Sequence, residues 1–141
     1  MLCNSPQVVN EYIGLDVQGY ILENEIKRDD FNIVYKANNK ELNNYATCNI
    51  IEIDLLKTNW ELELQKVKEK IIGIPQVMQY IGYSIKTIKG IPLVFILSQF
   101  MEGKNLDEFI KENPQGITIS FICHFFRDIL ALFHAMQIAG I

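Results

Sequence analysis

Hydrophobic and polar positions divide the chain into a strand-rich first part and a helical last part. Apolar, aromatic and β-branched residues concentrate in five runs, which are residues 20–26, 31–37, 45–53, 77–85 and 91–99. Runs of this kind, separated by asparagine, glycine and lysine-glycine turn signals, are typical of β-strands. We therefore expect five strands, with Lys89 and Gly90 turning the hairpin between the last two.

Between the third and fourth runs the spacing changes to that of a helix. One apolar stripe recurs at intervals of four, three and four residues and consists of Trp60, Leu64, Val67 and Ile71. Such intervals place side chains on one face of an α-helix. Thr58 followed by Glu61 fits a capping box at its start, and Gly73 with Pro75 ends it.

The last part of the chain predicts two more helices. A short one begins at Asn105 and is closed by Asn113 and Pro114. Thr118 can cap a longer one that runs to a glycine stop at Gly140.

The longer helix is unusually apolar from Phe121 to Met136. Its polar residues fall on one narrow stripe, formed by His124, Arg127, Asp128 and His134. A helix with so little polar surface is normally surrounded, because several phenylalanines in water would cost several kcal/mol at roughly 25 cal/mol per Å². We expect a protein partner, or further chain of its own, to cover it. A membrane surface is not expected, since the polar stripe lacks lysine and the longest apolar run, residues 91–97, is too short to span a bilayer.

Composition limits the other possibilities. The chain has 141 residues, 49% of them hydrophobic, and a net charge of −4, which gives no basic surface for nucleic acid. Cys3, Cys48 and Cys123 are odd in number and far apart, which indicates free thiols in a reducing compartment. The two histidines are ten residues apart, so no metal site is expected. We expect a cytoplasmic protein. Asparagine and isoleucine are abundant, as in proteins from AT-rich protist genomes, and this alone suggests a cytoskeletal or ciliary location.

The order of these elements, together with several short motifs, resembles the N-terminal lobe of a eukaryotic protein kinase. Residues 31–37, FNIVYKA, match the family's F-G-x-V-Y-K-A, and residues 45–51 match the strand that carries V-A-I-K. Residues 60–72 lie where the regulatory C helix belongs, and residues 97–103, LSQFMEG, are similar to the hinge. The resemblance covers roughly residues 18–141.

The resemblance implies an α+β fold with three regions. Residues 1–17 are an N-terminal extension. Residues 18–103 form a kinase-like N-lobe, a five-stranded antiparallel sheet with a C helix. Residues 104–141 correspond to helices D and E at the start of a C-lobe, and the family's H-R-D and D-F-G motifs would follow Ile141.

The positions that hold ATP in the family are degenerate in this sequence. Lys27, Asp29 and Asn32 stand where the family's phosphate-binding loop has glycines, and Asn49 replaces the V-A-I-K lysine. A carboxylate and side chains in place of glycine oppose close approach of phosphate. The remaining positions of the implied pocket are the hinge residues Ser98, Gln99 and Met101.

Four further side chains bear on the same site, two lysines that could compensate for the lost charge and two glutamates that would lack their usual lysine partner. Lys27 or Lys36 could in principle replace the lost lysine, and Glu61 or Glu63 corresponds to the C-helix glutamate. Both lysines fit solvated surface positions as well, so we expect no catalytic residue, no bound metal and no cofactor.

Three hypotheses follow from this pattern. The first is an inactive kinase-like module that acts by contact, as a scaffold or adaptor in a larger assembly. The alternative is the N-terminal part of a longer Ser/Thr protein kinase that binds ATP and Mg²⁺. A third is a pseudokinase that regulates a true kinase through its C helix; the sequence does not separate it from a passive scaffold.

Overall fold

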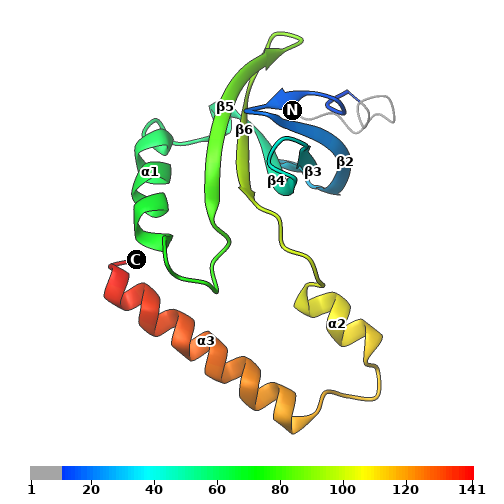
Figure 1. The fold of residues 1–141 in the computed structure, drawn as a ribbon, viewed down its shortest axis with the longest axis vertical. Coiled ribbons are helices and arrows are strands. Elements are labelled where there is room, and N and C mark those ends of the chain that lie inside the picture. Colours follow the sequence, from blue (N-terminus) through cyan, green and yellow to red (C-terminus); the bar gives the residue numbers. More distant parts are fainter. Residues whose placement is uncertain (1–10) are drawn as a thin grey trace. The chain divides into compact units, whose positions relative to one another are not determined.

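The computed structural model describes residues 11–141. The fold is α+β, with strands in the first two thirds of the chain and two helices at the end (Figure 1). The chain divides into two compact units: Met1–Glu63 with Met78–Phe100, and Leu64–Val77 with Met101–Ile141. The elements are β1 (Asp16–Val17), β2 (Tyr20–Arg28), β3 (Ile33–Asn39), β4 (Asn44–Glu52), the 3-10 turn η1 (Ile53–Leu55), α1 (Trp60–Ile71), β5 (Tyr80–Ile88), β6 (Ile91–Gln99), α2 (Leu106–Glu112) and α3 (Ile119–Ala139).

The sheet of the first unit has six antiparallel strands in the order β1-β2-β3-β4-β6-β5. The expectation of five strands was therefore wrong by one. β1 pairs only Asp16 with Ile21 and Val17 with Tyr20, and two residues are too few to show an alternating pattern. The expected boundary between residues 17 and 18 falls between β1 and β2.

The other strands confirm the expected order with shifted ends. Phe31 lies in the turn before β3, with 64% of its surface exposed. β5, which corresponds to the fourth expected strand, begins at Tyr80 rather than residue 77. Backbone hydrogen bonds from the Ile74 N–H to Ile71 and from the Val77 N–H to Ile74 continue turns through the preceding segment. The β5–β6 hairpin turns at Lys89 and Gly90 as predicted, both with positive φ, which suits the twist of a two-residue turn.

One face of the sheet forms the hydrophobic core. Side chains alternate strictly between buried and half-buried along β3, as the period of a strand requires. The largest fully buried side chains include Tyr35, Phe95 and Leu22. Residues on the opposite face of β3, β4 and β6, such as Val34, Asn49 and Ser98, are half-buried.

Two side-chain contacts connect the segments that flank β1 with β5 and the turn that follows it. Gln18, in the β1–β2 turn, donates from Nε2 to the carbonyl oxygen of Tyr83 on β5 at 2.6 Å. A Cβ on the adjacent Gly82 would meet the Gln18 amide oxygen directly, so this glycine leaves room for the contact. Glu11 and Lys89 form an ion pair at 2.9 Å. The two edges of the sheet are thereby joined by side chains.

The predicted helices of the second unit are confirmed with their caps. Asn105 and Glu108 form a reciprocal capping box at the start of α2. Thr118 caps α3 by accepting from the Phe121 N–H, and Gly140 ends it in the left-handed conformation.

The start of α1 differs from the prediction. The N–H of Glu63 donates to the carbonyl of Asn59 at 3.1 Å, so Asn59 rather than Thr58 holds the cap position. Within the second unit, Lys70 near the end of α1 donates to the Gly140 carbonyl at 2.8 Å, and Ile71 is buried.

Candidate functional site

The hairpin between β2 and β3 is the segment that the sequence singled out as a phosphate-binding loop. The Asp29 carboxylate Oδ1 accepts hydrogen bonds from the backbone N–H groups of Phe31 (3.0 Å) and Asn32 (2.9 Å). The Asp29 N–H in turn donates to the Asn32 carbonyl at 2.9 Å. The tip is a tight turn in which the Asp29 carboxylate accepts from two of the backbone N–H groups that follow it.

A second contact ties this hairpin to the neighbouring strand. Asn32 donates from Nδ2 to Oδ1 of Asn49 on β4 at 3.1 Å, across seventeen residues of sequence. The side-chain oxygen of the same Asn32 amide, Oδ1, is buried without a hydrogen-bond partner. The structure thus brings together three of the predicted positions, Asp29, Asn32 and Asn49, through direct hydrogen bonds.

The strand register sets the distances of the remaining lysines from this cluster. Lys27, Val34 and Asn49 lie in one row across β2, β3 and β4. Adjacent strands are about 4.8 Å apart, so the backbones of Lys27 and Asn49 are separated by about 10 Å. Lys27 is exposed.

Lys36, the other candidate, is engaged elsewhere. Its ammonium lies 4.1 Å from the ring centre of Tyr45 and 4.6 Å from that of Phe100, and the two rings are 6.1 Å apart. Cation–π contacts of this kind hold an ammonium over aromatic faces. The Lys36 charge therefore sits between two aromatic rings. The sequence did not predict this cluster, because Lys36 comes from β3, Tyr45 from β4 and Phe100 from the segment directly after β6.

The hinge-like residues occupy the end of β6 and the segment after it. Ser98 pairs with Thr47 and is half-buried on the same face as Asn49, two residues along β6 from Ile96, the partner of Asn49. Gln99 is exposed and accepts at its side-chain oxygen from the Gln79 N–H at 3.3 Å. Met101 belongs to the second unit and is 51% exposed.

The two candidate glutamates of α1 differ in what the structure shows for them. Glu61 accepts a hydrogen bond from the Tyr83 hydroxyl at 3.0 Å, and Trp60 contacts the Tyr83 ring edge to face at 5.0 Å. The bond to Glu61 raises the pKa of Tyr83 above its usual value. Glu61 therefore joins the start of α1 to β5; Glu63 contributes its N–H to the first turn of the helix.

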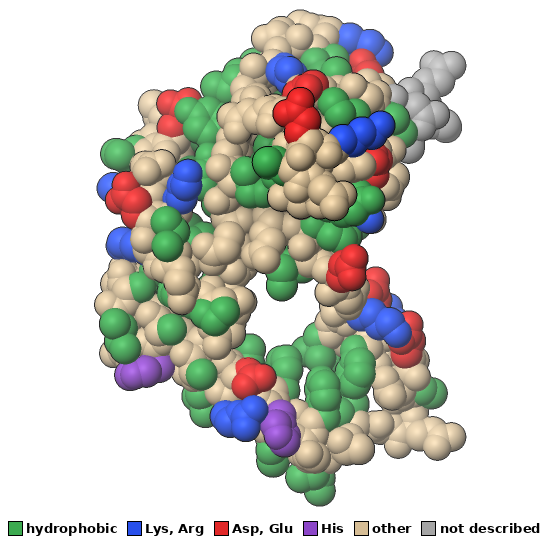
Figure 2. Space-filling view, viewed as in Figure 1, with side chains coloured by type: hydrophobic (Ala, Val, Ile, Leu, Met, Phe, Trp, Pro, Cys, Tyr) green, Lys and Arg blue, Asp and Glu red, His purple; other side chains and the backbone are tan. Residues whose placement is uncertain are grey.

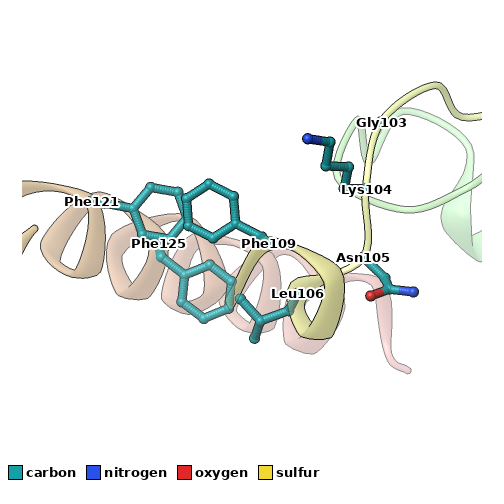
Figure 3. A pocket seen from close by; sticks show the side chains of 7 residues that line it. All are labelled: Gly103, Lys104, Asn105, Leu106, Phe109, Phe121 and Phe125. Atoms are coloured by element: carbon teal, nitrogen blue, oxygen red, sulfur yellow. The ribbon is translucent and has the colours of Figure 1, made fainter. Parts of the chain in front are cut away.

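A second candidate region lies in the other unit, between α2 and α3. A cavity of about 480 Å³ is lined mainly by Leu106, Phe109, Phe121 and Phe125. Phe109 and Phe121 stack with ring centres 4.6 Å apart (Figure 3). Hydrophobic side chains gather between these helices in the lower part of Figure 2.

The polar residues beside this cavity are already used. Lys104 pairs with Glu112, and the Asn105 side chain caps α2; Figure 3 shows the Asn105 amide directed away from the rings. Small-molecule sites combine an apolar lining with a few convergent polar groups. The lining of this cavity provides apolar contacts without free polar groups, which suits another polypeptide better than a small ligand.

Within residues 11–141, no group of three or more His, Cys, Asp and Glu side chains is placed to hold a metal ion. Cys3 lies outside the described residues. In the same part of the chain, α3 is long and apolar enough by length and composition to cross a membrane, with a mean hydropathy of 1.4 and none of that window buried.

Comparison with known proteins shows the fold. No family model and no curated protein sequence matches the chain. Solved structures do match: the crystal structure of the Mycobacterium tuberculosis PknI kinase domain is similar with a TM-score of 0.67 at 10% identity, covering 90% of this chain and 51% of that one. Two further PknI kinase domain structures, one of them a mutant, give a TM-score of 0.68 at the same identity and coverage. The chain has a protein-kinase-like fold and spans about half the length of these kinase domains.

Proposed function

We propose that this chain is a catalytically inactive kinase-like module that works by contact, as a scaffold or adaptor subunit of a larger assembly. In this proposal α1 corresponds to the kinase C helix, and α2 and α3 correspond to helices D and E. The apolar surface from Phe121 to Met136 is the contact that a protein partner covers.

The observation that carries the proposal is the hydrogen bonding of Asp29. In a glycine-rich loop, backbone N–H groups are free to receive phosphate oxygens. In this hairpin the N–H groups of Phe31 and Asn32 already donate to the Asp29 carboxylate. A phosphate would have to displace that carboxylate and then lie beside its negative charge, which is repulsive.

The state of the strand position supports the same proposal. Asn49 is a neutral amide whose oxygen accepts from Asn32, so it supplies no positive charge to a triphosphate. Lys36 is held between Tyr45 and Phe100. Two positions of the implied nucleotide site, and one lysine that could have compensated, are thus engaged in contacts of their own.

The alternative is the N-terminal part of a longer Ser/Thr kinase that binds ATP. Its support is the exposed Lys27, which shares a row with Asn49. A lysine side chain reaching across from β2 would have to bridge most of the roughly 10 Å between the two backbones.

The test is a thermal-shift titration with Mg·ATP. A ligand at one hundred times its dissociation constant stabilises a protein by about 2.7 kcal/mol, so saturable binding would raise the melting temperature by several degrees. We expect no saturable shift at millimolar Mg·ATP, with a PknI kinase domain as the positive control. A saturable shift that the Lys27→Ala variant loses, and a Lys36→Ala variant keeps, would establish the alternative instead.

A further inference from the structure

Five apolar side chains form one exposed stripe along α3. They are Ile119 (80% exposed), Ile122 (41%), Phe126 (57%), Leu130 (66%) and Phe133 (59%). At 3.6 residues per turn these positions fall within an arc of about 80°. We call this set the outer stripe. It adjoins the half-buried face of the same helix, to which Phe125 and Ile129 belong.

The spacing of the outer stripe is the same in both directions. Its intervals are three, four, four and three residues, with Phe126 at the centre. A second helix of the same sequence running antiparallel, related by a twofold axis at Phe126, therefore meets the stripe with an identical pattern. Phe126 then faces its own copy, and Ile122 faces Leu130. Such self-complementarity is what an isologous interface requires.

Size and charge agree with this pairing. The stripe is about 21 Å long at 1.5 Å per residue. Ten large apolar side chains at about 100 Å² each would bury about 1,000 Å², the lower limit for a specific interface. The charged neighbours Arg127 and Asp128 pair with each other at 3.5 Å. By helical position they lie about 100° and 160° away from the stripe, so pairing buries neither charge.

We propose that the outer stripe is a homodimer interface in which two copies of α3 pack antiparallel about Phe126. The inference rests on the proposed role as a contact module and names the partner as a second copy of this chain. Packing of this kind places apolar residues at intervals of three and four against each other, as in other helix pairs.

The first experiment measures oligomeric state by sedimentation velocity from about 1 to 100 μM. The wild-type chain is expected to sediment as a dimer at the upper end of this range. Phe126→Arg, which places two arginines on the twofold axis, is expected to raise the dissociation constant at least about a hundredfold. Ile138→Arg is the matched control: Ile138 is 75% exposed on the same helix but about 120° from the stripe, so this variant remains dimeric.

The second experiment tests the antiparallel register. Ile122→Lys and Leu130→Glu each place a lone charge against an apolar side chain in their own homodimers. When the two variants are mixed, the introduced lysine of one chain faces the introduced glutamate of the other, and the second pair stays apolar. The mixture is therefore expected to form heterodimers, while each variant alone is monomeric. A parallel pair would align position 122 with position 122 and show no such rescue.

Three results overturn the proposal. One is a wild-type chain that stays monomeric and folded by circular dichroism over the whole range. Another is association that Phe126→Arg and Ile138→Arg weaken equally. The third is a monomer that binds phosphatidylcholine vesicles through the same stripe, which would make the occupant a lipid surface. The Mg·ATP titration does not depend on oligomeric state, so failure here and failure of the proposed function are distinguishable.

Discussion

The hydrogen bond between Asn32 and Asn49 makes an asymmetric prediction about stability. Asn49 contributes an acceptor, whereas Asn32 contributes a donor at 3.1 Å and also carries a buried oxygen with no partner. Asn49→Ala leaves the entire Asn32 amide without a partner from this contact. Asn32→Ala loses the bond but also removes the unpaired buried oxygen.

The expected changes in the free energy of unfolding follow from the cost of losing a hydrogen bond and of leaving a buried polar atom unpaired. A net hydrogen bond is worth about 1 kcal/mol, and leaving a buried polar atom unpaired costs about 1–3 kcal/mol. We therefore expect Asn49→Ala to destabilise the fold by about 1–2 kcal/mol. Asn32→Ala is expected to change stability by less than about 0.5 kcal/mol, because the two terms offset each other. In the Asn32→Ala background, Asn49→Ala is expected to cost almost nothing, since its orphaned partner is gone.

Urea denaturation of the four proteins of this double-mutant cycle measures these values, provided that the m-values agree. The reasoning fails if Asn49→Ala is equally destabilising in both backgrounds, with a coupling below about 0.3 kcal/mol. It also fails if Asn32→Ala is the more costly substitution. Either result would mean that the hairpin is not held to β4 by this bond.

Two further predictions concern the sheet and its pH dependence. Gly82→Ala is expected to destabilise the fold by about 1 kcal/mol, because the added methyl group must displace the Gln18 amide from the Tyr83 carbonyl. In a Gln18→Ala background the same substitution is expected to leave the free energy of unfolding unchanged. If urea denaturation gives the same loss of stability in both backgrounds, the contact between Gln18 and Tyr83 is contradicted. Burial raises the pKa of Cys48 from 9.0 to about 12, so the stability tied to the neutral thiol is complete below pH 9 and falls by about 1.4 kcal/mol per pH unit from pH 9 toward 12. Cys48→Ala is expected to remove most of the fall between pH 9 and 10, because Tyr35, whose pKa burial raises from 10.0 to about 12, contributes mainly above pH 10. Stability curves of equal slope for the wild type and the variant between pH 9 and 10 would refute this prediction.

The elements of the fold were predictable where local signals decide them. Thr118, Asn105 and Gly140 identify the helix ends because capping depends on neighbouring residues alone. The two-residue strand β1 was missed because it is defined by pairing with β2 rather than by its own pattern. Thr58 and Asn59 are adjacent and both good capping residues, so the sequence alone did not decide between them.

The candidate site was predictable only in part. A resemblance to kinases supplied the positions Asp29, Asn32 and Asn49, but no pattern indicated that they bond to one another. Contacts such as Asn32 with Asn49, or Lys36 with Tyr45 and Phe100, depend on strand register and rotamers. The phenylalanine-lined cavity likewise needs two helices to be placed together, which the spacing within each helix does not specify.

The side-chain links between the sheet edges have a consequence for how this protein behaves at high concentration. An unprotected outer strand offers a row of free backbone groups to any other chain and is a common route to fibrils and amorphous precipitates. Gln18 occupies the carbonyl of Tyr83 in the middle of β5, and the Glu11–Lys89 pair sits at the hairpin beyond its far end. Side chains of other segments therefore bind at two points along or beside the nine-residue edge strand β5, and this disfavours self-association by addition of strands to that edge.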